Sequence, residues 1–157
     1  MSEPADENGP SAAAEMTGGY ALFAGLLGIV FLYLSLPMMI WFFGNEANPY
    51  GTTWNDGRPV AYHELQGGAM WRDIGTFGSG LLMLDHALLY GLTAIRPKIA
   101  KGTLLAVIVT SGLGIALNGA AAGMQIKAGF TSPLYALIGV ILFALSLATA
   151  VRLLRSN

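Results

Sequence analysis

Two ionisable residues, Asp85 and His86, stand side by side in an apolar stretch from about 73 to 95. On insertion scales a carboxylate at the centre of a membrane helix costs about 3 kcal/mol, so such a residue is treated as a functional hypothesis. Antiparallel neighbouring helices would bring Tyr33, Thr110 and Ser111 to the same depth. The sequence therefore predicts one polar cluster inside the membrane, formed by these five residues.

Four interpretations of this cluster remain open. Asp85 is protonated or hydrogen-bonded to Tyr33 or Ser111, and the cluster locks the helices together. Alternatively, Asp85 and His86 carry protons or line a quinone pocket. In the third interpretation His86 is an axial ligand of haem b, and the second ligand is Met83 or a partner's histidine. In the fourth, the cluster faces a polar group of a partner subunit.

The composition and motifs of the chain exclude several other kinds of functional site. The chain has no cysteine, which excludes thiolate metal sites, iron–sulfur clusters and cysteine nucleophiles. The net charge of −1 gives no basic surface for nucleic acid. His63, Asp56 and Glu64 lack the spacing of a metal site, and no phosphate-loop, dinucleotide, nucleophile-elbow or zincin motif is present. We therefore predict no catalytic residue and no metal site.

The hydrophobic pattern indicates the fold class. Only 11% of the residues are charged, against about a quarter in soluble domains. Apolar runs of about 20 residues are long enough to cross the hydrocarbon layer. The sequence predicts an all-α integral membrane protein, an up-and-down bundle of four transmembrane helices. Their expected ranges are about 20–43, 73–95, 102–124 and 132–153.

The domain organisation follows from the same pattern. Residues 1–19 are acidic, small and polar, so we expect a disordered tail. Residues 20–157 form a single four-helix domain. Pro37 is expected to bend the first helix, because proline removes a backbone hydrogen bond.

The long polar segment 44–72 separates the first two helices. It carries Trp54, Tyr62, His63 and Trp71, and aromatic residues are not expected to stand free in water. A loop of this length inside a compact protein is usually functional. We predict a structured outer loop that faces a partner.

The distribution of Lys and Arg predicts the orientation, because cytoplasmic flanks carry more of them. One side would hold Arg96, Lys98, Lys101, Arg152 and Arg155, and the other Arg58, Arg72 and Lys127. We therefore expect both termini in the cytoplasm and the loop outside, in a prokaryotic-type inner or plasma membrane.

Small residues on the third helix predict close packing. Gly112 and Ala116 are four residues apart, as are Gly119 and Gly123, and Asn118 lies between the two pairs. Such spacing lets helix backbones approach closely in a membrane. Plain bundle packing is the simpler interpretation, and contact with another subunit is the alternative.

These observations favour a small accessory subunit of a larger membrane complex, such as a respiratory or other electron-transfer complex, without catalytic activity of its own. Its partners would be the lipid bilayer and other membrane subunits. One alternative is a membrane redox subunit that binds haem or quinone through Asp85 and His86. The second alternative is a small homo-oligomeric channel or transporter with Asp85 in its path.

Overall fold

The computed structural model describes residues 12–44, 54–55, 58–59, 68–127 and 133–156. Its elements, in chain order, are α1 (Ala12–Gly44), β1 (Trp54–Asn55), β2 (Arg58–Pro59), α2 (Gly68–Ile95), the 3-10 turn η2 (Pro97–Ile99), α3 (Ala100–Lys127) and α4 (Leu134–Ser156).

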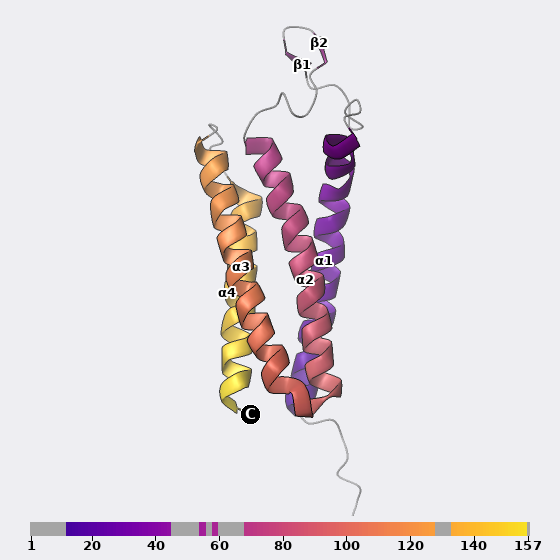
Figure 1. Ribbon diagram of the computed structural model, residues 1–157, viewed down its shortest axis with the longest axis vertical. Coiled ribbons are helices and arrows are strands. Elements are labelled where there is room, and N and C mark those ends of the chain that lie inside the picture. Colours follow the sequence, from indigo (N-terminus) through magenta and orange to yellow (C-terminus); the bar gives the residue numbers. More distant parts are fainter. Residues whose placement is uncertain (1–11, 45–53, 56–57, 60–67, 128–132, 157) are drawn as a thin grey trace, which may run out of the picture.

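The four α-helices confirm the predicted all-helical bundle. Four segments are long and apolar enough to cross a membrane: Ala14–Leu36 in α1, Met70–Ile95 in α2, Pro97–Lys127 across η2 and α3, and Leu134–Ser156, which is α4. The helices run alternately up and down, so α1 begins and α4 ends at the same end of the bundle (Figure 1). The short antiparallel pair β1–β2 lies beyond the opposite end, here named the loop end.

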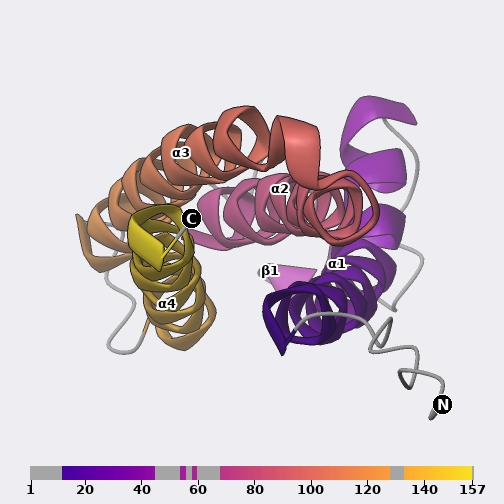
Figure 2. The ribbon, with the colours of Figure 1, turned by 90° about the horizontal axis from the view of Figure 1, so that it is seen from below.

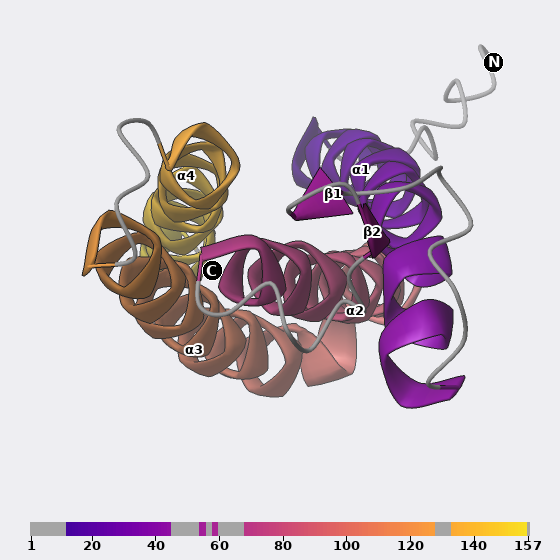
Figure 3. The ribbon, with the colours of Figure 1, turned by 90° about the horizontal axis from the view of Figure 1, so that it is seen from above.

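The starts of two helices differ most from the prediction, while the other boundaries lie within about three residues of it. Helix α1 begins at Ala12, so residues 12–19 are helical where the sequence predicted a disordered tail. Ala and Met are strong helix formers, and they continue directly into the apolar segment. Helix α2 begins at Gly68, before the predicted 73. The last turns of α1 lean away from its axis (Figure 3).

Helix α2 is the centre of the bundle. It packs along α1 on one side and along α3 on another, and α3 in turn packs along α4. Helices α1 and α4 lie on the same side of α2 without packing along each other (Figure 2). Helix α2 therefore borders the space between α1 and α4.

Helices α1 and α2 approach closely through reciprocal glycine–leucine contacts. A Cβ added at Gly28 would lie 2.9 Å from the side chain of Leu84, and one at Gly80 would lie 2.8 Å from Leu32. Each leucine therefore occupies the space that a glycine leaves open on the other helix. Close backbone contact of this kind stabilises helix pairs where lipid removes the hydrophobic driving force.

Helices α2, α3 and α4 are joined by buried hydrogen bonds. The Asn118 amide of α3 donates to the Ser79 hydroxyl of α2 at 2.8 Å. Nearer the other end, the hydroxyls of Thr93 and Thr103 lie 2.6 Å apart. Polar side chains inside a membrane bundle hold the rotation and depth of each helix, because a slip would leave them unpaired in an apolar medium.

The predicted packing residues of α3 divide between two faces. Asn118 is buried between the helices, but Gly112, Ala116, Gly119 and Gly123 are exposed, and no atom of another helix lies within 4 Å of a Cβ built at any of the three glycines. The rotation of α3 is set by its buried row instead, where Gly114 receives the Phe143 ring. The exposed positions of these four small residues therefore do not support the simpler interpretation, in which they pack against the chain's own helices.

Gly114 and Gly112 form a matched pair for testing this rotation. Gly114→Ala should lower the free energy of unfolding by about 1–3 kcal/mol, because the new methyl overlaps the Phe143 ring. Gly112→Ala adds the same methyl to an exposed position and should cause no loss. SDS titration of the purified protein, followed by circular dichroism, measures both, and equal effects would contradict the assigned rotation.

Candidate functional site

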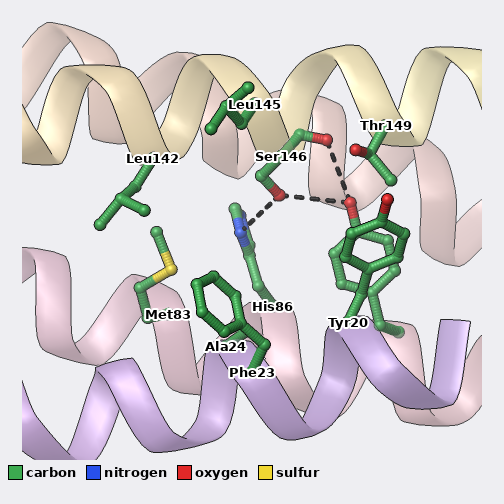
Figure 4. A pocket seen from close by; sticks show the side chains of 10 residues that line it. Tyr20, Phe23, Ala24, Met83, His86, Leu142, Leu145, Ser146 and Thr149 are labelled. Atoms are coloured by element: carbon green, nitrogen blue, oxygen red, sulfur yellow. Dashed lines mark hydrogen bonds between the residues drawn. The ribbon is translucent and has the colours of Figure 1, made fainter. Parts of the chain in front are cut away.

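A cavity of about 240 Å³ lies between α1, α2 and α4 (Figure 4). Its polar lining comes from Tyr20, His86, Tyr90, Ser146 and Thr149. Its apolar lining comes from Phe23, Ala24, Met83, Leu142 and Leu145. The cavity exists because α1 and α4 both pack near α2 but not along each other.

His86 forms part of the cavity wall and is completely buried. Its Nε2 lies 2.8 Å from the Thr110 hydroxyl of α3, and its Nδ1 lies 3.0 Å from the Ser146 hydroxyl of α4. The Thr110 hydroxyl donates to the Ala106 carbonyl at 3.0 Å, so its oxygen accepts the Nε2 proton. The Ser146 hydroxyl then donates to Nδ1. The imidazole therefore connects three helices.

Tyr90 extends this hydrogen-bonded chain by one helical turn. Its hydroxyl donates to the Ser146 carbonyl at 3.0 Å and lies 3.2 Å from the Ser146 hydroxyl. The Tyr90 ring contacts the ring of Tyr20 from α1, with 5.7 Å between centroids. The Ser146 hydroxyl thus lies between the imidazole of His86 and the phenol of Tyr90, and the dashed lines in Figure 4 mark these contacts.

The rim of the cavity lies on the outer surface of the bundle. Phe23 of α1 is 57% exposed, and Leu145 of α4 is 61% exposed. If the four helices cross a membrane, this rim faces the lipid tails. The cavity is then accessible from the side, between two helices, to a molecule dissolved in the bilayer.

The structure brings together only part of the predicted cluster. His86 and Thr110 are hydrogen-bonded, whereas Tyr33 is 77% exposed on the outer face of α1. Asp85 does not line the cavity, and within the described chain neither its Oδ2 nor the Ser111 hydroxyl has a hydrogen-bond partner. The expected bond from Asp85 to Tyr33 or Ser111 is therefore absent. Successive helical residues point about 100° apart, so equal depth did not imply contact.

Sequence reasoning missed four polar residues of the site: Tyr20, Tyr90, Ser146 and Thr149. One signal was available, because His86 and Tyr90 are four residues apart and therefore share a helix face. The contribution of α4 had no comparable signal, since the depth argument compared only helices adjacent in sequence.

Three further predictions concern haem ligation, a metal site and the outer loop. Both ring nitrogens of His86 are hydrogen-bonded, so in this arrangement neither is available to ligate haem iron. The described ranges contain no group of three or more His, Asp or Glu that could hold a metal ion. Of the loop residues, Trp71 is half-buried in α2 and Trp54 belongs to β1, while Tyr62 and His63 lie outside the described residues.

Comparison of this chain with protein-family models, curated proteins and solved structures found no match. The interpretation of the site therefore depends on its own geometry.

Ser146 and Ser111 provide a test of the hydrogen-bonded chain. Ser146→Ala removes the partner of the His86 Nδ1 and should lower the free energy of unfolding by about 1–2 kcal/mol, since membrane side-chain hydrogen bonds contribute up to that amount. Ser111→Ala removes a buried hydroxyl without a partner and should cause no comparable loss. The same SDS titration measures both variants. A larger loss for Ser111→Ala would contradict this assignment.

Proposed function

We propose that this chain is an integral membrane protein that binds a quinone-type molecule, taken from the bilayer, in the cavity between α1, α2 and α4. The observation that supports this proposal is a cavity with apolar walls and five polar residues, of which His86, Ser146 and Tyr90 are hydrogen-bonded to one another while Tyr20 and Thr149 add two further hydroxyls. Small-molecule sites commonly combine apolar walls with a few well-placed polar groups.

The chemistry of a quinone fits this lining. A quinone ring has two apolar faces, and its carbonyl oxygens accept hydrogen bonds at the ring edge. Phe23, Met83 and Leu142 supply surfaces for the ring faces. The hydroxyls of Tyr20 and Thr149 can donate to a carbonyl oxygen, and His86 and Tyr90 hold Ser146 in position beside it.

The size of the cavity favours a single ring over a macrocycle. Its volume of about 240 Å³ is below the range of about 300–1,000 Å³ that is usual for drug-sized ligands. A lipid-soluble tail would leave between Phe23 and Leu145, where both side chains are exposed. Haem b is less well supported, because the His86 nitrogens are engaged and a porphyrin needs more space.

The role of the chain would be to hold the ring, provide hydrogen bonds and exclude water. Reduction of a quinone needs two electrons and two protons, and a partner would supply the electrons. We therefore retain the prediction of a small subunit in an electron-transfer assembly. The outward face of α3, with Gly112, Ala116, Gly119 and Gly123, supports it, because small residues allow another helix to approach.

A channel with Asp85 in its permeation path has weaker support, because Asp85 does not line the cavity between α1, α2 and α4.

Binding of ubiquinone-1 to the chain in lipid nanodiscs tests the proposed function. We expect saturable binding above that of empty nanodiscs. Ala24→Leu should weaken it at least tenfold by filling the cavity, because Ala24 lines it. Tyr20→Phe should weaken it about fivefold, because it removes a hydroxyl donor from the cavity wall, which corresponds to the loss of about 1 kcal/mol.

Ala120→Leu is the matched control, because it enlarges an exposed alanine on α3 far from the cavity lining. It should leave binding unchanged. Binding to the full chain no greater than to empty nanodiscs, or equal affinity for Ala24→Leu, would contradict the proposal.

A further inference from the structure

The hydroxyls that line the cavity between α1, α2 and α4, here named the His86 cavity, are of two kinds. Those of Ser146 and Tyr90 belong to the hydrogen-bonded chain of His86. Those of Tyr20 and Thr149 (Figure 4) make no hydrogen bond to another described residue. The second pair can therefore donate to a ligand or accept from it, whereas the first pair is restricted.

Every donor of the hydrogen-bonded chain is engaged within it. With the proton on Nε2, the His86 ring donates to Thr110, the Ser146 hydroxyl donates to Nδ1, and the Tyr90 hydroxyl donates to the Ser146 carbonyl. With the proton on Nδ1, the ring donates to Ser146 Oγ, and the Ser146 hydroxyl turns to Tyr90 Oη, 3.2 Å away. The Thr110 hydroxyl then donates to Nε2. In neither tautomer does the hydrogen-bonded chain keep a donor for a ligand.

The oxygens of Ser146 and Tyr90, in contrast, keep acceptor positions. With the proton on Nε2, as the bond from Thr110 to the Ala106 carbonyl indicates, both hydroxyls donate and neither accepts a proton from the hydrogen-bonded chain. A hydroxyl oxygen that donates its own proton still has lone pairs that accept hydrogen bonds. Toward a ligand in the cavity, Ser146 and Tyr90 therefore act as acceptors only.

Burial keeps the hydrogen-bonded chain closed. His86 and Tyr90 are 0% and 2% exposed, so water does not reach them to replace a broken bond. Turning the Ser146 hydroxyl toward a ligand would leave the Nδ1 of His86 without a donor. An unpaired buried polar group costs about 1–3 kcal/mol, so a ligand that needs a donor at this position binds less well.

A quinone and the quinol formed by its reduction differ in the hydrogen bonds that they can make. The two carbonyl oxygens of a quinone only accept, whereas the two hydroxyls of a quinol donate and accept. A quinone can use the free donors of Tyr20 and Thr149, but an oxygen placed beside Ser146 or Tyr90 would face lone pairs. A quinol hydroxyl at the same place would donate to them.

We infer that the His86 cavity binds the quinol more tightly than the corresponding quinone. One ring hydroxyl donates to the acceptor pair of Ser146 and Tyr90, and the other contacts the hydroxyls of Tyr20 and Thr149. His86 determines this preference, because its ring occupies the donor of Ser146. The inference rests on the proposed function, since it names the oxidation state of the ligand proposed there.

Separate anaerobic titrations of the full chain in lipid nanodiscs with ubiquinol-1 and with ubiquinone-1 test this inference. Affinities are corrected for the partitioning of each compound into empty nanodiscs. The dissociation constant should be about fivefold lower for ubiquinol-1, because the quinol makes one additional net hydrogen bond.

Two stacked tyrosines of the cavity provide a matched pair of variants. Tyr90→Phe removes an oxygen that only accepts from the ligand, so it should weaken binding of ubiquinol-1 about threefold and leave that of ubiquinone-1 unchanged. Tyr20→Phe removes a free donor, so it should weaken ubiquinone-1 at least as much as ubiquinol-1. Ser146→Cys, which replaces the acceptor oxygen by a weakly accepting sulfur, provides a second variant if Tyr90→Phe does not fold. Ala120→Leu should leave both affinities unchanged.

The outcomes separate this inference from the proposed function. Binding of neither compound above empty nanodiscs would contradict both. Binding of ubiquinone-1 as tightly as ubiquinol-1, or more tightly, would overturn only the preference for the reduced form. An equal loss of both compounds with Tyr90→Phe, or with Ser146→Cys in its place, would also overturn it, because the oxygen removed would then not distinguish a donor from an acceptor.

Discussion

The arrangement of this bundle depends on the need to pair polar side chains inside an apolar medium. His86 meets that need with Thr110 on one side and Ser146 on the other, and Tyr90 shares Ser146. An unpaired polar group in hydrocarbon costs several kcal/mol, so these bonds strongly favour one rotation and one depth for α2, α3 and α4. The buried Asn118–Ser79 bond acts in the same way nearer the loop end.

Helix α1 is held by a different interaction. Gly28 receives Leu84, and Gly80 receives Leu32, so shape complementarity joins α1 to α2. This packing uses one side of α2, while the hydrogen bonds to α3 and α4 use another. The His86 cavity lies where the two kinds of packing meet, because nothing requires α1 to close against α4. An accessible site can therefore exist beside a tightly paired three-helix unit.

A second cavity, of about 200 Å³, lies nearer the loop end between the same three helices, and its lining differs from that of the His86 cavity. At mid-depth three of the polar residues, His86, Ser146 and Tyr90, are hydrogen-bonded to one another. At the loop end the lining includes a charged pair, Arg72 and Asp73. Both cavities have exposed apolar residues at their rims.

The sequence by itself determined the number of helices, their type and most of their limits, because long uncharged apolar runs leave the backbone only one way to satisfy its polar groups in a membrane. It also identified His86 and Thr110. It did not reveal that α4 supplies Ser146, that Asp85 turns away from the cavity, or that Gly112 and Gly119 face outward. Those features depend on the rotation of each helix about its axis and on contacts between segments far apart in the chain. Only the tertiary packing sets the helix rotations and these distant contacts. Depth in the membrane can be counted along a sequence, but the direction of a side chain cannot.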